Sequence, residues 1–480
     1  MDYRKNQQVT VKIEDIGING EGIGRISGYT LFVKDAIVGD LVEASLTKVK
    51  KTYAYARLVR VIEPSKDRIT PPCKIYRQCG GCQIQALSYA AQLAFKQQKV
   101  MNDLIRIGGI SKEELKEIME PIVGMSDADQ SGDAGFRYRN KAQYPIGRNR
   151  DGKLIAGFYA GRTHAIMETD DCLLGPGENG EILKSVLTHM ERYQIMPYDE
   201  ESGTGLVRHV MIRKGFASGQ IMVCLVINGR SLPESEILVE NLKEIDGVCS
   251  IYLNVQQEKT NVILGEENIL LWGSAWIEDM IHICDVNNGF APTREALTYA
   301  ISPLSFYQVN PKQTERMYSQ ALQYADLKGT ETVWDLYCGI GTISLFMAKR
   351  ARFVMGVEVV EQAVEDAREN AARNCIENAA FLTGKAEEIL PAYYAEPAGE
   401  FTHPDVIVVD PPRKGCDSKC LETMAHMKPS KIIYVSCDPA TLARDVKYLS
   451  ENGYRLTKAR AFDNFPQTVH VETVCLLTKK

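Results

Sequence analysis

The sequence contains no long hydrophobic run. Its longest unbroken apolar segment is Ile221–Ile227, far shorter than the ~20 apolar residues that a membrane-spanning helix needs. The first eight residues, MDYRKNQQ, include no apolar stretch, so we expect neither a signal peptide nor a membrane anchor. Internal repeats and low-complexity tracts are also lacking. These absences argue against membrane-spanning, secreted, collagenous and disordered proteins, and they predict a cytoplasmic globular protein.

The sequence also lacks an excess of positive charge. Lys and Arg number 56 against 62 Asp and Glu, for a net charge of −6, which excludes a histone-like protein held to nucleic acid by bulk charge. Thirteen cysteines are an odd number, and without a secretory signal they are more often buried, metal-bound or catalytic than paired as disulfides. With 480 residues, 45% of them hydrophobic, the chain is long enough for about three domains.

Residues 1–63 read as a small β module. Val9–Ile13 alternates with period two, and closely spaced glycines follow, so short strands and tight turns predict a barrel of the oligonucleotide-binding (OB) type. Lys48–Arg60 carries five cations and no acid, interleaved with Tyr53 and Tyr55. This segment is either a nucleic-acid-binding surface or a solvated edge strand guarded by lysines.

Residues 64–292 are predicted as a β-rich central domain. A helical pattern runs from Gln85 to about Ile107, and the stretch of about 88–119 is expected to pack on the carboxy-terminal domain. Ser111–Asp133 is acidic and predicts an irregular loop. Phe136–Arg150 contains five cations, three aromatic residues and no acid, which suits phosphate contacts and base stacking better than a plain strand–loop–strand.

Residues 293–480 alternate strands with helices, which predicts an α/β domain with a doubly wound, Rossmann-like parallel sheet. The segment from Asp335 to Gly341 reads as a strand end and a glycine turn, and a second strand ends at Glu358, where a carboxylate can accept hydrogen bonds from ribose hydroxyls. Nicotinamide binding is disfavoured because Ser344 occupies the place of the third glycine of G-x-G-x-x-G.

Two later strand ends carry reactive side chains. Asp405–Arg413 (DVIVVDPPR) ends in Asp410 and an extended Pro-Pro loop. Such loops resemble the substrate-side loop of S-adenosylmethionine-dependent methyltransferases that act on planar nitrogenous rings. In Ile432–Pro439 (IIYVSCDP), Asp438 suits the N-cap of a helix and Pro439 its first position.

This placement puts Cys437 at a helix start, where the helix dipole is expected to lower the thiol pKa and favour the nucleophilic thiolate. Cys338, Cys375 and Cys475 lie within apolar patterns and are predicted to be buried and inert.

Glu472 interrupts an otherwise apolar closing strand. Partial burial there would raise its pKa towards neutrality, as suits a general base. A thiolate, a methyl donor and a base together fit methylation of carbon 5 of uracil. Addition of the thiolate at carbon 6 activates carbon 5, and the base then removes the carbon 5 proton. The target base must leave its stack.

Five long motifs occur in one fixed order between Phe306 and Val474: FYQVNP, DLYCGIGTISL, DPPRKG, SCDPATLARD and DNFPQTVHVETV. Together they resemble the TrmA/RumA family of RNA uracil-5-methyltransferases. The resemblance implies S-adenosylmethionine as cofactor, held by Gln308, Tyr337, Glu358 and Asp410. It also implies Cys437 as nucleophile and Glu472 as the proton-abstracting base.

Cys73, Cys79 and Cys82 lie within ten residues, and Cys172 follows far downstream. Their spacing alone permits tetrahedral zinc or an iron–sulfur cluster. The pattern C-x5-C-G-G-C with a remote cysteine resembles the [4Fe–4S] site of the ribosomal-RNA branch of the family. We expect such a cluster to act as a folding staple rather than as a redox centre. The amino-terminal barrel resembles a TRAM domain. By the same resemblance, the transfer-RNA enzymes of the family lack both the [4Fe–4S] site and the TRAM-like barrel. The presence of both features here therefore indicates 23S ribosomal RNA as the substrate.

The sequence therefore predicts a cytoplasmic enzyme that makes 5-methyluridine in 23S ribosomal RNA, at a single-stranded or loop uridine flipped out of its stack. No obligate protein partner and no membrane is expected. A cytosine-5 RNA methyltransferase is the nearest alternative, but it would carry a cysteine after the D-P-P loop, where this chain has Arg413. A non-catalytic iron–sulfur RNA-binding protein is the second alternative.

Overall fold

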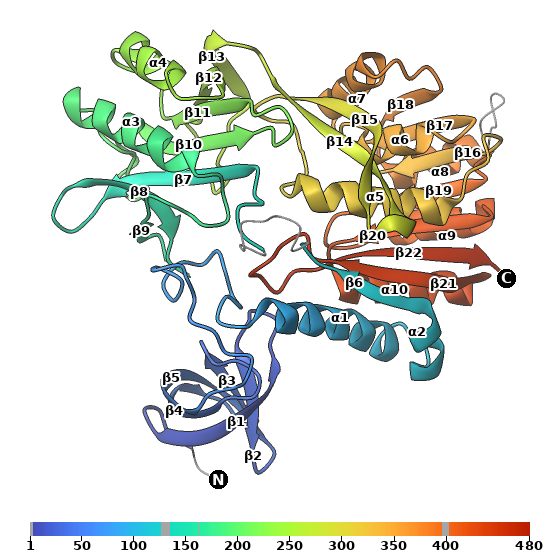
Figure 1. The fold of residues 1–480 in the computed structure, drawn as a ribbon, viewed down its shortest axis with the longest axis horizontal. Helices are drawn as coiled ribbons and strands as arrows, with labels where there is room; N and C mark the ends of the chain where they lie inside the picture. Colours follow the sequence, from blue (N-terminus) through green and yellow to red (C-terminus); the bar gives the residue numbers. More distant parts are fainter. Residues whose placement is uncertain (1–2, 126–134, 162, 396–402) are drawn as a thin grey trace.

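The computed structural model describes residues 3–125, 135–161, 163–395 and 403–480. Figure 1 shows a small barrel and a central sheet on one side of the molecule and a larger sheet with covering helices on the other. No helix in these described ranges is long and apolar enough to cross a membrane.

The amino-terminal barrel is closed by five strands in the order β1-β2-β3-β5-β4. They are β1 (Gln8–Ile16), β2 (Gly22–Ile26), β3 (Tyr29–Lys34), β4 (Leu41–Val49) and β5 (Tyr53–Glu63). Alternating apolar side chains such as Ile13, Leu31 and Val42 fill its interior, as the period-two pattern predicts. The predicted OB-like barrel is confirmed.

The central region holds a seven-stranded sheet in the order β13-β12-β11-β10-β7-β8-β9. Its strands are β7 (Lys141–Arg148), β8 (Leu154–Tyr159), β9 (Ile166–Glu168), β10 (Val207–Lys214), β11 (Ile221–Ile227), β12 (Val248–Val255) and β13 (Glu267–Gly273). Helices α3 (Glu178–Arg192) and α4 (Ser235–Lys243) contribute apolar side chains to one core with it. A hairpin of β14 (Ile277–Asp285) and β15 (Ala291–Ile301), joined by a short 3-10 helix η1 (Val286–Asn288), leads into the carboxy-terminal domain.

The carboxy-terminal domain is built on an eight-stranded sheet in the order β18-β17-β16-β19-β20-β22-β21-β6. The strands are β16 (Thr332–Leu336), β17 (Phe353–Glu358), β18 (Ala379–Thr383), β19 (Val406–Val409), β20 (Lys431–Ser436), β21 (Tyr454–Phe462), β22 (Glu472–Lys479) and β6 (Met119–Val123). The five from β18 to β20 are parallel, and β22 is antiparallel to its neighbours. Strand order reverses between β16 and β19, where doubly wound sheets bind their ligands.

Helices cover both faces of this sheet. They are α5 (Pro311–Ala325), α6 (Thr342–Ala348), α7 (Glu361–Arg373), α8 (Ala386–Ala395), α9 (Ser418–Met427) and α10 (Pro439–Glu451). Two apolar cores result, one on each face. Every residue of β16 and β19 is buried, as two-sided coverage of a parallel sheet requires. The predicted Rossmann-like α/β fold is confirmed.

Three elements from the early part of the chain also join this domain. Helix α1 (Tyr89–Arg106) packs against α10, β6 and β21, and a short helix α2 (Lys112–Ile118) follows it. Strand β6 then pairs in parallel with β21 at the sheet edge. The loop predicted for 111–133 is therefore wrong where the structure describes it, and residues 126–133 lie outside the described ranges. The domain limits proposed from sequence place one boundary, 292/293, inside β15.

Candidate active site

A cavity of about 870 Å³ opens at the reversal point of the sheet. Loops at the carboxyl ends of β16, β17, β19 and β20 form it, together with the segment before α5 and the start of β22. Because carboxyl ends of parallel strands meet at one edge, side chains far apart in sequence converge here. The cavity is lined by all six residues predicted for cofactor binding and catalysis, which are Gln308, Tyr337, Glu358, Asp410, Cys437 and Glu472.

The Glu358 side chain holds the backbone of two loops that line the cavity. Its carboxylate accepts hydrogen bonds from the backbone N–H of Gly339 at 3.1 Å and of Val360 at 3.0 Å. The Gly339 N–H is therefore taken by this carboxylate. Each carboxylate oxygen accepts more than one hydrogen bond, so Glu358 keeps acceptor capacity for ribose hydroxyls.

Tyr337 and Gly341 both have left-handed backbone, with φ of +71° and +83°. At a residue other than glycine this conformation costs free energy and tends to mark functional turns. The wall beside this turn is apolar and accessible, since Val359 and Val360 are more than half exposed. An apolar wall next to a hydrogen-bonding carboxylate suits a planar base joined to a ribose.

Gln308 is held from the central domain. The side-chain amide of Asn140 donates to the Gln308 carbonyl at 2.9 Å, and the N–H of Asn140 donates to the carbonyl of Val309, also at 2.9 Å. Upstream, the buried guanidinium of Arg213 on β10 donates to the carbonyls of Pro303 and Ser305. The contacts of Asn140 and Arg213 could not be predicted from the sequence, because no local pattern links either residue to the segment before α5.

The cavity is rich in carboxyl groups. Seven of its lining residues are Asp or Glu and three are Lys or Arg. Burial raises the pKa of Asp335 to about 7, although the hydroxyl of Ser344 donates to it at 2.5 Å. Ser344, the residue in the place of the third glycine, therefore provides a hydrogen bond to this buried carboxyl group. Enclosure also raises the pKa of Asp410 to about 6. Such a cavity favours a cationic ligand.

Cys437 follows β20 and directly precedes the cap of α10. The predicted cap is confirmed, since the Asp438 side chain accepts from the N–H groups of Ala440 and Thr441, and Pro439 opens the helix. The expected lowering of the thiol pKa is wrong. Burial, together with the carboxyl groups of Glu472 and Asp410, raises the Cys437 pKa to about 12.

The physical reason is competition among charges. The helix N-terminus already faces the Asp438 carboxylate, which takes up the partial positive charge that was expected to favour the thiolate. Arg413 is the cation that opposes the rise in the Cys437 pKa. Arg413 follows directly after Asp-Pro-Pro in the sequence, and this position was the available signal for a role of Arg413 in the site beyond the distinction from cytosine enzymes.

Glu472 is the first residue of β22 and is only 3% exposed. Burial and the neighbouring Asp410 raise its pKa well above that of an ordinary carboxyl group, and Arg413 again opposes the shift. His470, two residues earlier, also lines the cavity, and burial lowers its pKa to about 4, so it is neutral at physiological pH. The closing strand thus presents a proton-exchanging carboxyl group and an uncharged imidazole.

A second cavity, of about 1020 Å³, reaches the same cysteine from the other side. It lies between α1 and the loop after β1 of the barrel, and it shares Arg413, Cys437 and His470 with the first cavity. Ile18, at the tip of that barrel loop, is 79% exposed and lines it. A substrate entering from the barrel side would therefore reach the thiol through this second cavity.

The four cysteines of the predicted metal site, Cys73, Cys79, Cys82 and Cys172, lie in one region. Burial and the neighbouring cysteines raise the pKa of Cys79 and Cys82, and the Gly81 N–H reaches the Cys79 sulfur at 3.4 Å. In the ranges that the structure describes, however, no three His, Cys, Asp or Glu side chains are grouped to hold a metal ion. At these cysteines the structure therefore supports neither a zinc ion nor an iron–sulfur cluster.

Three further cysteines were predicted to be buried, and the structure agrees for two of them. Cys338 and Cys475 are buried, as expected. Cys375 is exposed, so its predicted burial is wrong. It follows the last turn of α7 with a left-handed backbone, where the chain leaves the apolar stripe of the helix.

The basic segment Phe136–Arg150 is only partly available for RNA. Arg137 forms a bidentate ion pair with Asp171, and Tyr138 and Tyr144 are buried. Among the described residues, Arg139 and Lys141 have no such carboxylate partner, and burial lowers the pKa of Lys141 to about 8. The expectation of three stacking aromatic residues is therefore wrong for two of them, because they serve the core.

On the barrel the aromatic residues are accessible. Phe32, Tyr53 and Tyr55 are half-buried, and their ring centroids lie 5.4 to 5.8 Å apart. The lysines Lys48, Lys50 and Lys51 beside them are exposed. Aromatic faces next to cations favour base stacking with phosphate contacts.

Comparison with known proteins gives matches at both ends of the chain. Residues 286–480 match the family model described as tRNA (Uracil-5-)-methyltransferase, and residues 4–59 match the TRAM domain. Uncharacterized RNA methyltransferases are similar over nearly the whole length. One from Clostridium tetani is 46% identical, with 99% of this chain and 97% of its own length covered, and one from Listeria innocua is 44% identical, with 99% of each covered.

Among solved structures, the Pyrococcus abyssi tRNA (uracil-54, C5)-methyltransferase in complex with S-adenosyl-L-homocysteine is similar, with a TM-score of 0.73 and 26% identity. The match covers 98% of this chain and 99% of that one, so it includes the barrel. The expectation that transfer-RNA enzymes of this kind lack the barrel is therefore wrong for this relative, and the barrel does not by itself indicate ribosomal RNA.

Proposed function

The chain belongs to the RNA uracil-5-methyltransferase family of S-adenosylmethionine-dependent enzymes, and from this premise we propose that it methylates carbon 5 of a uridine in 23S ribosomal RNA through a covalent bond to Cys437. The observation that carries the proposal is the position of Cys437 between two cavities. One is rich in carboxyl groups and suits a cationic methyl donor. The other opens towards the barrel and suits an extruded base.

The carboxyl-rich cavity fits the methyl donor chemically. We propose that Glu358 binds the ribose and that Gln308 and Asp410 orient the methionine end, with Tyr337 shaping the turn between them. The carboxyl groups around the cavity complement both the sulfonium and the amino group. When bound, S-adenosylmethionine supplies an electrophilic methyl group on a positively charged sulfur atom.

The reaction begins with the Cys437 thiol, whose proton must leave because only the thiolate adds to a pyrimidine. Asp410, with a pKa of about 6, is ionised at neutral pH and is a carboxylate of the same cavity that can take this proton. Arg413 then stabilises the thiolate. The Sγ–C6 bond forms, and its electron pair makes carbon 5 of the ring nucleophilic.

After carbon 5 has accepted the methyl group, it still carries its original proton. We propose that Glu472 removes that proton, so that the electron pair returns to the ring and the Sγ–C6 bond breaks. Sulfur leaves as the thiolate, Asp410 returns the proton that regenerates the thiol, Glu472 releases its proton to solvent, and the product is 5-methyluridine. Burial of Glu472 suits this role because a raised pKa makes its carboxylate a stronger base than an ordinary one.

The proposed RNA is a single-stranded or loop uridine of 23S ribosomal RNA, supported by the four-cysteine pattern that resembles the ribosomal-RNA branch. The second candidate is a transfer RNA, favoured by the full-length similarity to the Pyrococcus abyssi enzyme. We further propose that Cys73, Cys79, Cys82 and Cys172 hold a [4Fe–4S] cluster, supported by the resemblance of their spacing in the sequence to the ribosomal-RNA branch. Anaerobic purification with iron and acid-labile sulfide analysis, in wild type and Cys79→Ser, tests this.

Nucleoside analysis of ribosomal and transfer RNA from cells that lack the protein tests the proposed reaction. We expect loss of 5-methyluridine from 23S ribosomal RNA, with rescue by wild type and none by Cys437→Ala. Loss confined to transfer RNA would select the second substrate. Loss of 5-methylcytidine alone would reject the uracil specificity, and unchanged nucleosides would favour a non-catalytic RNA-binding protein.

Purified variants test the chemistry. Cys437→Ala should abolish turnover while leaving S-adenosylmethionine affinity largely intact. Glu472→Gln should accumulate a covalent enzyme–RNA adduct, seen as a retarded band on a denaturing gel, since methylation precedes proton removal. A Glu472→Gln protein that turns over normally, with no retarded band, would reject the assigned base.

A further inference from the structure

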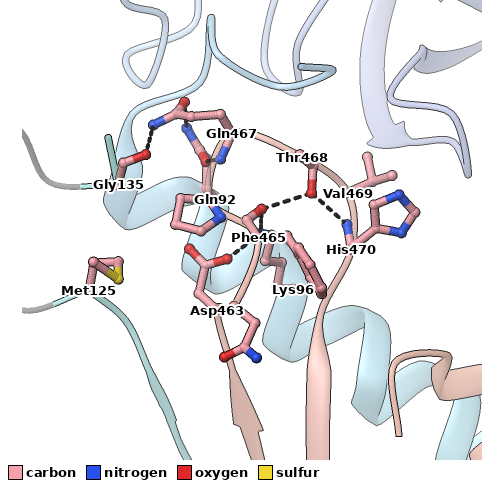
Figure 2. A network of polar contacts seen from close by, with 12 residues as sticks. Gln92, Lys96, Met125, Gly135, Asp463, Phe465, Gln467, Thr468, Val469 and His470 are labelled. Carbon is pink, nitrogen blue, oxygen red and sulfur yellow. Dashed lines mark hydrogen bonds and ion pairs between the residues drawn. The ribbon is translucent and has the colours of Figure 1, made fainter. Parts of the chain in front are cut away.

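Helix α1 contacts the loop 463–471, which joins β21 to β22, through a fully buried ion pair. The Lys96 ammonium pairs with the Asp463 carboxylate, and both side chains are 0% exposed. The same ammonium donates to the carbonyl of Phe465 at 2.9 Å. Figure 2 shows Lys96 reaching this loop from the helix. Removing one partner of such a pair leaves an uncompensated buried charge, so the contact strongly favours one position of the loop.

Gln92, one turn earlier on α1, holds the next part of the loop. Its amide donates to the Gln467 side chain at 2.9 Å and accepts from the Gln467 backbone N–H at 3.0 Å. Gln467 has a left-handed backbone with φ of +69°, a conformation that persists in a non-glycine residue only when its surroundings impose it. The reciprocal amide contact supplies that constraint.

One turn later, Lys99 donates to the carbonyl of Val469 at 3.0 Å. Residues 92, 96 and 99 follow the i, i+4, i+7 spacing of one helix face. Three successive turns of α1 therefore hold the loop from Asp463 to Val469. Figure 2 shows Gln92 and Lys96 on the helix beside the loop, with the His470 ring at the far end of the loop.

The segment held in this way carries active-site groups. Phe465 and His470 line the carboxyl-rich cavity, and Glu472 follows two residues after His470. Lys96 and Asp463 line neither cavity, so they do not touch the reacting atoms. The point at which the loop enters β22 determines the position of the Glu472 carboxyl group. The contacts with α1 hold the loop, and so they also hold this point.

We propose that Lys96, from a helix more than 360 residues earlier in the chain, is a positioning residue that holds the 463–471 loop so that Glu472 can remove the carbon 5 proton. This inference rests on the proposed function and adds a residue outside the part of the chain that matches the methyltransferase family model. It predicts that loosening the loop slows proton removal more than it weakens binding of the methyl donor.

The test compares Lys96→Met with Leu104→Ala in the full-length protein. Leu104 lies on the same helix, is fully buried and packs in the apolar core instead of on the loop, so its truncation destabilises α1 without releasing the loop. For Lys96→Met we expect kcat to fall about 10- to 100-fold with the KM for S-adenosylmethionine unchanged, and covalent adduct to accumulate. Leu104→Ala should lower the thermal unfolding midpoint with kcat near wild type.

A double variant, Lys96→Met with Asp463→Leu, covers the case in which the single variant fails to fold. Replacing both charges by apolar groups removes the orphaned carboxylate and should restore stability. Our proposal expects kcat to stay low and adduct to accumulate, because the loop is still not held. Recovery of kcat together with stability, or equal kcat in Lys96→Met and Leu104→Ala, would overturn it. A wild-type protein that forms neither adduct nor 5-methyluridine would instead refute the proposed function.

Discussion

Cys437 lies among groups that oppose the charge its chemistry requires. Burial and two carboxyl groups raise its pKa, and the cap of α10 occupies the helix end that could have lowered it. The resting thiol is therefore protonated at neutral pH. In the proposed mechanism, a protonated resting nucleophile is protected from alkylation and oxidation, and we expect it to become reactive when a cationic methyl donor and the RNA base fill the two cavities.

The first prediction concerns the reactivity of this thiol. Between pH 7 and 9, iodoacetamide should label Cys437 on the order of 10²- to 10³-fold more slowly than an ordinary cysteine, with the rate rising about tenfold per pH unit, because so little thiolate is present. Mass spectrometry of each cysteine measures it, and the exposed Cys375 is the control in the same chain. Equal labelling rates of the two cysteines would contradict the raised pKa.

The second prediction concerns Arg413, which lowers the pKa of both Cys437 and Glu472. Both groups must be unprotonated to act, so turnover should fall as pH falls through the neutral range. In Arg413→Met both pKa values rise further, and the acid limb of the rate profile should move to higher pH. Arg413→Lys, which keeps a cation, should move it less. A profile that does not move in Arg413→Met would show that Arg413 is not coupled to these groups.

At the scale of elements, the active site is completed by parts of the chain outside the carboxy-terminal domain. Strand β6 extends its sheet, α1 contacts the loop before Glu472, and β10 of the central sheet holds the segment that leads to Gln308. Long-range hydrogen bonds make these elements one unit. Amphipathic and alternating patterns revealed several of them as elements, but a pattern within one segment carries no information about its partner.

The third prediction tests the contact from β10. Arg213→Met leaves the carbonyls of Pro303 and Ser305 without their buried donor, which should cost about 1–3 kcal/mol of unfolding free energy and raise the Kd for S-adenosylmethionine about tenfold. Urea unfolding and calorimetric titration measure the two effects. Arg208→Met is the matched control, because Arg208 is buried on the same strand but donates to Gln256 and Glu258 instead. An unchanged Kd in Arg213→Met would refute the link.

At the scale of the whole molecule, the barrel forms one wall of the cavity that leads to Cys437. The aromatic cluster and the exposed lysines Lys48, Lys50 and Lys51 lie on that same barrel. With a net charge of −6, the chain as a whole does not attract RNA, so binding depends on such local basic surfaces.

The fourth prediction tests this basic surface. Replacing Lys48, Lys50 and Lys51 by Ala should raise the KM for RNA with little change in kcat, and it should reduce the slope of log K against log salt by about 0.7 for each lost contact with single-stranded RNA. Lys328→Ala, at an exposed lysine paired with Asp326 in the carboxy-terminal domain, is the control. An unchanged salt slope in the triple variant would show that this face does not bind RNA.

The barrel and the Rossmann-like sheet could be predicted from the sequence because their strands and helices have local signatures. The irregular loop predicted for 111–133 was wrong because β6 is a short edge strand of five residues whose apolar pattern is interrupted by Glu120 and Pro121. The stacking role of Tyr138 and Tyr144 was wrong because composition shows which residues are present, and only packing shows which are buried.

The sequence by itself determined which reactive side chains end the strands of one parallel sheet, and the geometry of such a sheet brings those ends to one edge. Hence Glu358, Asp410 and Cys437 could be assigned to one cavity in advance, and Glu472 joins them because the antiparallel strand β22 begins at that same edge. Only the tertiary structure decided their protonation, the contact of α1 with the loop before β22, and how closely the cysteines approach one another. Proton affinity and long-range pairing depend on burial and distance in space, which the order of residues along a chain does not contain.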